Sequence, residues 1–459
     1  MIMIKKIPKV LIFGQSFNKN TGGGITLGNL FDGWPKDKIA VANIGHGMRD
    51  VDFSVCVNYY LLGKNEYKWM FPFNKLQRHF ESGVITPNTN NVTENKISNQ
   101  TGSVTLNTRK IFIEKVFFPF LHYMGFSPKM SKLILSSSFK TWLDRYQPDV
   151  IYVQVSNLEA INFVLELKAY LKKPVILHMM DDWPAVISSK GPLKNYWNNK
   201  IDKALKNLLS SCSLLMSISH AMTEEYQQRF GLKFTAFHNP INIENWLPFS
   251  KNNWKVDTNR DFKILYTGRI GTANTDSIKK IAIAIDSLCA EGYNISLDIY
   301  SPNIDTEHAK GLKVFNGVNL KKIVPHHNIP ALLPQYDLLV LPLDFDSKSI
   351  KFARLSMPTK ASEFMISGTP ILVFAPQQTA LAKYAAKEKW AYVVTDTAEE
   401  TIKNALKQLI KDESLRAVLG NRAKTLAAET EDAQIIRKNF KDAICSVCTF
   451  KKTDIINVY

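Results

Sequence analysis

The chain has 459 residues, of which 45% are hydrophobic and 22% are charged, and its formal net charge is +17. This composition is typical of a globular protein and excludes the disordered, collagen-like and disulfide-rich classes. One hydrophobic core rarely fills such a length, so two domains of roughly 200 residues each are expected.

Short apolar runs alternate with helix-length segments along the first half of the chain. The composition of these runs predicts strands at residues 10–14, 149–155, 174–179 and 213–219. Apolar residues at helical spacing predict helices over residues 158–171 and 193–209. Residues 84–110 are rich in Asn, Thr and Ser and are predicted to form a mobile loop.

The strand pattern restarts after a polar, proline-bearing stretch. Further strands are predicted at residues 262–268, 295–301, 337–343, 370–375 and 391–394. Alternation of strands and helices indicates parallel sheets covered by helices. The sequence therefore predicts two α/β domains, residues 1–247 and residues 248–459, the second ending in a C-terminal helix.

The cysteines and the apolar runs suggest a compartment. Five cysteines are an odd set, and the Cys445 and Cys448 pair has no second pair to complete a metal site. No run has the eighteen or more apolar residues of a membrane span, and residues 10–13 are too short for a secretory core. A cytoplasmic protein without a bound metal is expected.

Positive charge is concentrated in the first half of the chain. Basic and aromatic residues interleave in residues 64–80 and 115–146, a pattern that can rest on an anionic membrane face. A core helix with solvated lysines explains the pattern equally well. No DNA- or RNA-binding motif accompanies the charge, so nucleic acid is not an expected partner.

A short helix is predicted between two strands, beginning near Pro358 and ending at Gly368. Unpaired N–H groups at its start attract anions. Glu363, one turn after Thr359, could accept both hydroxyl protons of a ribose. Nearby cations are Lys348, Lys351, Arg354 and Lys360. A capped surface helix explains the same residues.

The run P-T-K-A-S-E-F-M-I-S-G-T-P-I-L-V, residues 358–373, resembles the P-x-K-x-x-E-[YF]-x-x-x-G-x-P donor-binding motif of GT-B glycosyltransferases, especially the family 4-like enzymes. Other landmarks occur in the family's order: Gly22-Gly23-Gly24, H-x-x-D-D-W-P at 178–184, I-S-H-A-M at 218–222, H-N-P-I-N at 238–242 and Y-T-G-R-I-G at 266–271. The resemblance spans nearly the whole chain. It implies two Rossmann-like domains whose parallel sheets face a central cleft.

The resemblance also implies roles for individual residues. Donor binding is expected of Gly23, Gly24, Gly268, Pro358, Thr359, Lys360 and Glu363. Arg269 would bind the phosphates, His178 would lie on the transferred sugar, and Lys348 joins them in the catalytic set. Asp181 and Asp182 are expected on the sugar or acceptor side.

Two positions depart from the family pattern. Asn274 stands where many relatives have a lysine, so Lys348, Lys351 or Lys360 must supply any second cation. Leu355 stands where related enzymes often have a glutamate that contacts the donor sugar. Asp344 or Asp346 could take that role, or both could be solvated loop acids.

By resemblance, the chain is expected to be a retaining, metal-independent glycosyltransferase that needs no cofactor. It would move a sugar from a nucleotide-diphosphate sugar to a glycan or lipid-linked acceptor in surface polysaccharide or lipopolysaccharide biosynthesis. The cytoplasm, or the inner face of an anionic membrane, is the expected location. Two alternatives stay open: a sugar-nucleotide epimerase of the same fold, and a non-catalytic carbohydrate- or lipid-binding module, which the two departures favour.

Overall fold

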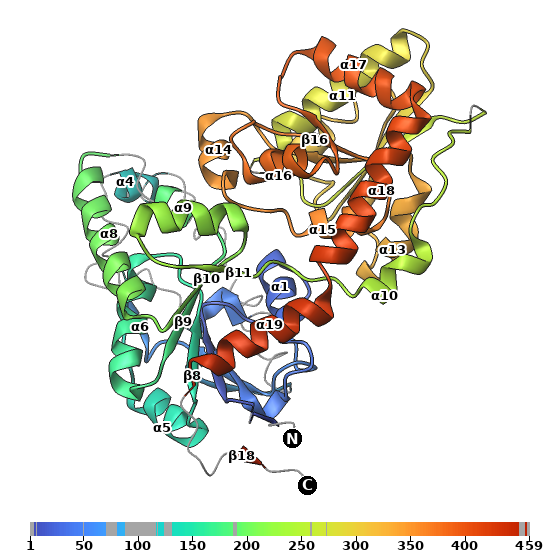
Figure 1. Cartoon of the computed structure of the whole chain (residues 1–459). Coiled ribbons are helices and arrows are strands. Elements are labelled where there is room, and N and C mark those ends of the chain that lie inside the picture. The colour runs from blue at the N-terminus through green and yellow to red at the C-terminus, as the bar shows by residue number, and fades with distance from the viewer. Residues whose placement is uncertain are drawn as a thin grey trace. The chain divides into compact units, whose positions relative to one another are not determined.

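The computed structural model describes residues 4–5, 7–48, 50–69, 80–87, 116, 118–123, 131–186, 191–257, 259–271, 273–448 and 455–456. The chain divides into two compact units: unit 1 is residues 1–237 with 437–459, and unit 2 is residues 238–436 (Figure 1). The sequence placed the domain boundary at 247/248 and the last helix in the second domain. Contacts instead begin unit 2 at His238 and group residues 437–459 with unit 1.

Unit 1 contains an eight-stranded sheet with the order β11-β10-β9-β8-β2-β3-β4-β6. Its strands are β2 (Val10–Phe13), β3 (Ile39–Ile44), β4 (Asn58–Leu62), β6 (Gly83–Ile85), β8 (Val150–Val153), β9 (Val175–Met179), β10 (Leu214–Ser217) and β11 (Thr235–Ala236). All neighbouring strands are parallel except β6, which is antiparallel to β4. The four strands predicted in this half are confirmed as β2, β8, β9 and β10; β3, β4, β6 and β11 were not predicted.

The helices of unit 1 are α1 (Gly22–Phe31), α4 (Phe118–Tyr123), α5 (Ser137–Tyr146), α6 (Leu158–Leu171), α7 (Trp183–Val186), α8 (Lys194–Ser211) and α9 (His220–Phe230). The predicted helices at 158–171 and 193–209 are confirmed as α6 and α8. Side-chain oxygens of Thr21, Ser136, Asn157 and Ser219 accept backbone N–H bonds at the starts of α1, α5, α6 and α9. Such caps satisfy otherwise unpaired N–H groups and set where each helix begins.

The last long helix, α19 (Ala433–Ser446), packs on the first. Figure 1 shows α19 in red beside α1, although unit 2 separates them in sequence. Nε of Arg437 donates to the carbonyl of Asn29 over 2.7 Å. The ring of Phe440 lies 5.1 Å from that of Phe31 and 6.0 Å from that of Tyr152. These contacts explain why the end of the chain belongs to unit 1.

Two short ladders complete unit 1. Strands β5 (Tyr67–Trp69) and β7 (Ser131–Leu133) pair antiparallel, as do β1 (Ile4–Lys5) and β18 (Ile455–Ile456). Most of the predicted loop at 84–110, and parts of the basic aromatic stretches at 64–80 and 115–146, lie outside the described residues. The first residues of that predicted loop belong to β6.

Unit 2 contains a six-stranded, fully parallel sheet with the order β14-β13-β12-β15-β16-β17. Its strands are β12 (Phe262–Thr267), β13 (Ile295–Ser301), β14 (Val318–Lys322), β15 (Leu338–Pro342), β16 (Ile371–Phe374) and β17 (Tyr392–Val394). All five strands predicted in this half are confirmed. The unpredicted β14 is an edge strand with a polar, partly exposed sequence, so it lacks the apolar run of a buried strand.

The helices of unit 2 are α10 (Ile243–Trp246), α11 (Thr275–Ala290), α12 (Glu307–Lys310), α13 (Ile329–Leu332), α14 (Ser347–Ala353), α15 (Lys360–Ile366), α16 (Ala380–Glu388), α17 (Glu399–Lys411) and α18 (Glu413–Thr430). Two 3-10 turns flank α13: η7 (His326–Asn328) and η8 (Leu333–Gln335). The helix predicted from Pro358 begins at Lys360, and Gly368, with φ of +68°, follows its end.

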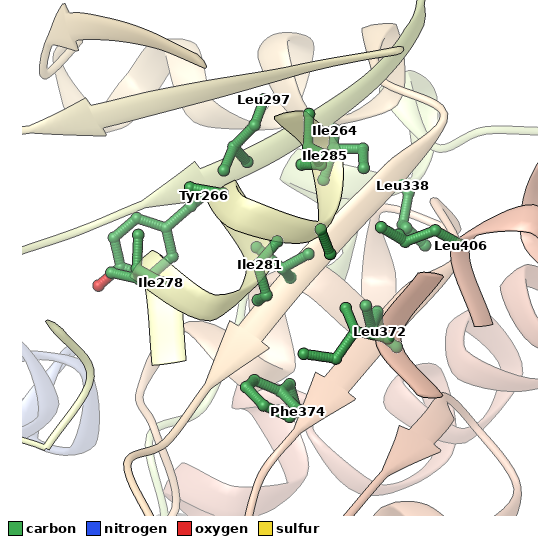
Figure 2. Close-up of a cluster of buried hydrophobic side chains, with 14 of the residues drawn as sticks. Ile264, Tyr266, Ile278, Ile281, Ile285, Leu297, Leu338, Leu372, Phe374 and Leu406 are labelled. Atoms are coloured by element: carbon green, nitrogen blue, oxygen red, sulfur yellow. The ribbon is translucent and has the colours of Figure 1, made fainter. Parts of the chain in front are cut away.

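Alternate residues of each central strand pack on opposite faces of the unit 2 sheet. Ile264 and Tyr266 of β12 join a cluster with residues of α11 and α17, shown in Figure 2. Leu265, between them, joins the opposite cluster with Phe364 of α15. Figure 2 shows Tyr266 beside Ile278, with its hydroxyl oxygen directed away from the other labelled side chains.

Two helical glycines, one in each unit, should respond in opposite ways to substitution by alanine. Alanine normally stabilises a helix interior by ~0.5–1 kcal/mol relative to glycine. Gly28→Ala in α1 should follow that rule, since nothing lies within 4 Å of its added Cβ. At Gly420 in α18, a Cβ would lie 2.2 Å from the carbonyl oxygen of Gly368 and 2.4 Å from Nε1 of Trp254.

We therefore expect Gly420→Ala to destabilise the protein by ~1–3 kcal/mol, the usual effect of overpacking. It must also disturb the bond from Nε1 of Trp254 to the carbonyl of Gly368, 2.9 Å long. Thermal unfolding of both variants checks this. A rise in melting temperature for Gly420→Ala would contradict the described packing of α18.

Candidate functional site

The order of strands in unit 2 reverses between β12 and β15, because β13 and β14 lie on one side and β16 and β17 on the other. Open parallel sheets bind ligands at the carboxyl ends of their strands at such a point. Hydrogen bonds link the loop after β15 to the loop after β12 at this point. The backbone N–H of Asp344 donates to the carbonyl of Ala273 over 2.8 Å, and Oδ1 of Asp344 accepts from the N–H of Ser277 over 2.7 Å.

This position of Asp344 bears on its expected role. The side chain is buried, and burial raises the pKa of Asp344 against the opposing hydrogen bonds from Ser277. Asp346 caps α14, accepting the backbone N–H groups of Lys348 and Ser349 over 2.9 and 3.1 Å. Both acids therefore hold loops and helix starts in place, and a sugar contact for either stays a prediction.

Asn274 organises the loop after β12. Its Nδ2 donates to the Tyr266 hydroxyl and to the carbonyl of Arg269, both over 3.0 Å. Its Oδ1 accepts the N–H of Gly271 over 2.9 Å, and the Tyr266 hydroxyl donates to the Arg269 carbonyl over 2.7 Å. The backbone at Arg269 is thus held from two sides while its side chain stays exposed.

Lys360 reaches back from α15 to the end of β12. Its Nζ donates to the carbonyl of Thr267 and lies 4.5 Å from the centre of the Tyr266 ring. Burial lowers the pKa of Lys360 to about 8, against the opposing charge of Glu363. A Cβ at Gly268 would lie 2.3 Å from this Nζ, and the φ of Gly268 is +131°. Only glycine fits both conditions.

Two other predicted cations lie on the helix that follows β15. Lys348 and Lys351 belong to α14, and both are exposed. Of the three lysines expected to replace the missing one at Asn274, Lys360 is the one that the structure brings to the carboxyl end of β12, next to the loop of Arg269. Leu355, at the position of the missing glutamate, is buried.

Glu363 projects from the first turn of α15 towards a residue that the sequence did not indicate. Its Oε1 lies 2.8 Å from Nε2 of His326, and the side chains of Glu363 and His326 are 14% and 64% exposed. The hydrogen bond with Glu363 raises the pKa of His326, more than burial lowers it. No local signal could have found this contact, because it joins residues 37 positions apart.

Three contacts fix how α15 is placed. Oγ of Ser362 donates to Oε2 of Glu431 over 2.8 Å, and that carboxylate also lies 2.9 Å from Nδ1 of His238. At the start of the helix, Nδ2 of Asn239 donates to the carbonyl of Thr359 over 3.4 Å. Thr359 itself, preceded by Pro358, makes no side-chain cap. These contacts fix the helix that carries Glu363.

The predicted glycine run of unit 1 begins α1. The hydroxyl of Thr21 accepts the N–H of Gly24 over 3.1 Å. A Cβ at Gly23 would lie 2.8 Å from Oε1 of Gln15, and one at Gly24 would lie 2.4 Å from Nδ2 of Asn18. These glycines let the preceding loop pack closely on the start of the helix; donor binding by them stays a prediction.

His178 lies inside the sheet, in β9. Its Nδ1 is 2.5 Å from the Tyr152 hydroxyl, and its Nε2 is buried with no hydrogen-bond partner among the described residues. Burial lowers the pKa of His178 to about 4, against smaller effects of the backbone at Ser217 and Phe237. The imidazole is therefore neutral near pH 7. Its predicted contact with the transferred sugar would be a hydrogen bond without charge.

The two predicted acids after β9 have different surroundings. Asp181 is exposed. Asp182 is buried: Arg229 donates to both of its oxygens, over 2.8 and 3.0 Å, and the Tyr226 hydroxyl donates to Oδ1 over 2.9 Å. The carboxylate of Asp182 thus anchors α9 to the end of β9, and a role on the sugar or acceptor side stays a prediction.

Removing the Asp182 carboxylate should destabilise unit 1. Asp182→Ala removes the bonds from Arg229 and Tyr226; since Arg229 is 28% exposed and keeps its 2.8 Å contact with Glu225, the loss should be roughly 1–3 kcal/mol. Asp181→Ala is the matched control and should change the free energy of unfolding far less. Chemical denaturation of both variants checks this, and equal stability of the two would contradict an anchoring role for Asp182.

No protein-family model and no curated protein matches the sequence. Among solved structures, HepE of Anabaena in complex with UDP and glucose matches with a TM-score of 0.59 and 14% identity, covering 96% of this chain and 100% of that one. Sucrose-phosphate synthase from Thermosynechococcus elongatus matches with a TM-score of 0.60 and 11% identity, over 95% of this chain and 98% of that one.

A UDP-forming α,α-trehalose-phosphate synthase from Burkholderia xenovorans matches with a TM-score of 0.55 and 12% identity, over 97% of this chain and 100% of that one. These proteins are GT-B glycosyltransferases. At such low identities the likeness concerns the fold. The chain has the predicted GT-B fold, built from two Rossmann-like units with parallel sheets.

Proposed function

We propose that this chain is a glycosyltransferase that moves a sugar from a nucleotide-diphosphate sugar to a glycan or lipid-linked acceptor. The observation that carries the proposal is the set of groups in unit 2: Glu363 with a fixed carboxylate, Lys360 with a buried amine, and Arg269 with an exposed guanidinium. An acceptor of hydroxyl protons and two cations suit a ribose joined to a diphosphate.

The donor is proposed to be a UDP-sugar. HepE was crystallised with UDP and with UDP-glucose, and its fold is that of this chain. The Glu363 carboxylate would accept the ribose hydroxyls, and Lys360 and Arg269 would attract the diphosphate. Surface polysaccharide or lipopolysaccharide biosynthesis is the proposed setting.

The proposed reaction retains configuration and needs no metal. The bond between the sugar and the departing phosphate breaks with its electron pair on the phosphate oxygen, and the sugar becomes oxocarbenium-like. Lys360 and Arg269 stabilise the developing negative charge. The acceptor hydroxyl then bonds to the same face of the sugar and gives its proton to the departing phosphate.

The proposed anionic membrane partner is supported by an exposed aromatic and basic surface on unit 1. Exposed apolar side chains gather on α4 and at the start of α8: Phe120, Tyr123, Leu193 and Tyr196. The loop before α8 packs on α4, since a Cβ at Gly191 would lie 1.7 Å from the carbonyl oxygen of Tyr123. Exposed lysines on α8 include Lys194, Lys200 and Lys203. No helix in the described ranges is long and apolar enough to cross a membrane.

The donor assignment predicts that Glu363→Ala weakens nucleotide binding without unfolding the protein. A hydrogen bond to a charged group is worth about 1.5–3 kcal/mol, so affinity for UDP should fall about 10- to 100-fold. Glu429→Ala, an exposed glutamate of α18, is the control. Calorimetry with UDP, GDP, CDP and ADP measures the effect; an unchanged dissociation constant in Glu363→Ala would refute the assignment.

The membrane assignment predicts salt-sensitive binding to vesicles that contain phosphatidylserine. Each lysine near such a surface contributes about 1 kcal/mol, so Lys200→Glu with Lys203→Glu should reduce binding at least about tenfold. The same charge change at Lys383 and Lys387, exposed on α16 of unit 2, is the control. Sedimentation with vesicles tests this. Equal losses in both double variants would show that net charge, not the α4 and α8 surface, governs binding.

A further inference from the structure

Glu363 contacts a histidine that the proposed donor chemistry has not used. Nε2 of His326 lies 2.8 Å from Oε1 of Glu363. His326 belongs to η7, which follows the edge strand β14, whereas Glu363 belongs to α15. The pair therefore depends on the tertiary fold and not on the spacing of residues along one helix.

Buried packing fixes the position of η7 against α15. Val324, before the turn, packs on the core cluster that contains Phe364 of α15. Ile329, directly after the turn, is buried in the same cluster. Further on, the hydroxyl of Thr369 donates to the carbonyl of Leu333 over 3.1 Å. His326 thus stands on a short segment that is anchored on both sides.

A carboxylate has two oxygens and about four lone-pair directions. When Nε2 of His326 bonds to Oε1, the carboxylate of Glu363 loses rotational freedom, while Oε2 and one further lone pair of Oε1 remain available. A group that is oriented beforehand loses less entropy when a ligand binds. The His326 side chain is 64% exposed, so it stands at the outer side of the nearly buried glutamate.

We propose that His326 is a positioning residue that holds the Glu363 carboxylate for the 2′- and 3′-hydroxyls of a ribose, and so makes the site select ribonucleotides over deoxyribonucleotides. This inference rests on the proposed function, because it assumes that Glu363 receives the ribose. The raised pKa of His326 is in keeping with a ring nitrogen that is bonded to a carboxylate.

Three variants of the full chain test the proposal. His326→Ala removes the contact with Glu363, and His326→Gln keeps an N–H donor on a side chain of similar reach. His327→Ala is the matched control, because His327 is the neighbouring exposed histidine of the same turn. The probes are UDP, GDP, CDP and ADP, each with its 2′-deoxy form, and calorimetry gives the affinities.

The wild type should bind its preferred ribonucleotide about tenfold more tightly than the 2′-deoxy form. His326→Ala should lower the affinity for the ribonucleotide about fivefold and that for the deoxynucleotide, which keeps only the 3′-hydroxyl, by less, so the selectivity falls. His326→Gln should restore most of the selectivity, and His327→Ala should behave as the wild type.

Other outcomes overturn the inference in distinguishable ways. Full selectivity in His326→Ala, together with a loss of binding in Glu363→Ala, would leave the proposed function intact and remove the role of His326. Equal losses for both nucleotide forms would show that His326 does not act through the ribose contact. A wild type that binds none of the four diphosphates would overturn the proposed function, and this inference with it.

Discussion

A parallel strand that is buried on both faces has no place for an unpaired charge along its length, and this constraint shapes both units. The residues of β2 and β8 in unit 1, and of β15 and β16 in unit 2, are all buried. An unpaired charge inside such a layer would carry a large desolvation penalty. Polar groups therefore gather where the strands end. Asp182 and Asp344, for example, lie in the first few positions after β9 and β15.

At the end of β12 the same constraint explains how a lysine comes to lie under a loop. The last carbonyl of the strand, that of Thr267, accepts a hydrogen bond from Nζ of Lys360. Gly268, the next residue, has no side chain and leaves the space that the amine occupies. Asn274 closes the loop with three hydrogen bonds. A lysine at that position could not accept the N–H of Gly271. The asparagine that departs from the family pattern therefore makes a loop contact that a lysine could not make. The loop is held by an amide, and the amine that lies beside it belongs to Lys360 of α15.

Much of the fold could be read from the sequence because buried strands of parallel sheets appear as unbroken apolar runs. Of the strands that were missed, the edge strand β14 is polar and gives no such signal, whereas β3 and β4 are apolar and buried and could have been found by the same rule. For the site, the motif of residues 358–373 located Glu363 and Lys360 correctly at the start of a helix. What local sequence could not give was pairing across the fold: Glu363 with His326, Asp182 with Arg229, and Asp344 with the loop after β12. Each of these joins elements that are distant along the chain.

The amine of Lys360 also links the site to the stability of the protein. Its pKa is about 8 in the folded chain against an ordinary value of 10.5, so an unfolded chain holds this proton more tightly. The free energy of unfolding is therefore reduced below pH 8, and it rises as the pH increases from about 8 to 10.5. An anion beside the amine would raise the pKa of Lys360 and so restore this part of the free energy of unfolding at neutral pH. The buried amine of Lys360 thus lowers the stability of the folded chain at neutral pH, and an adjacent anion would offset that loss.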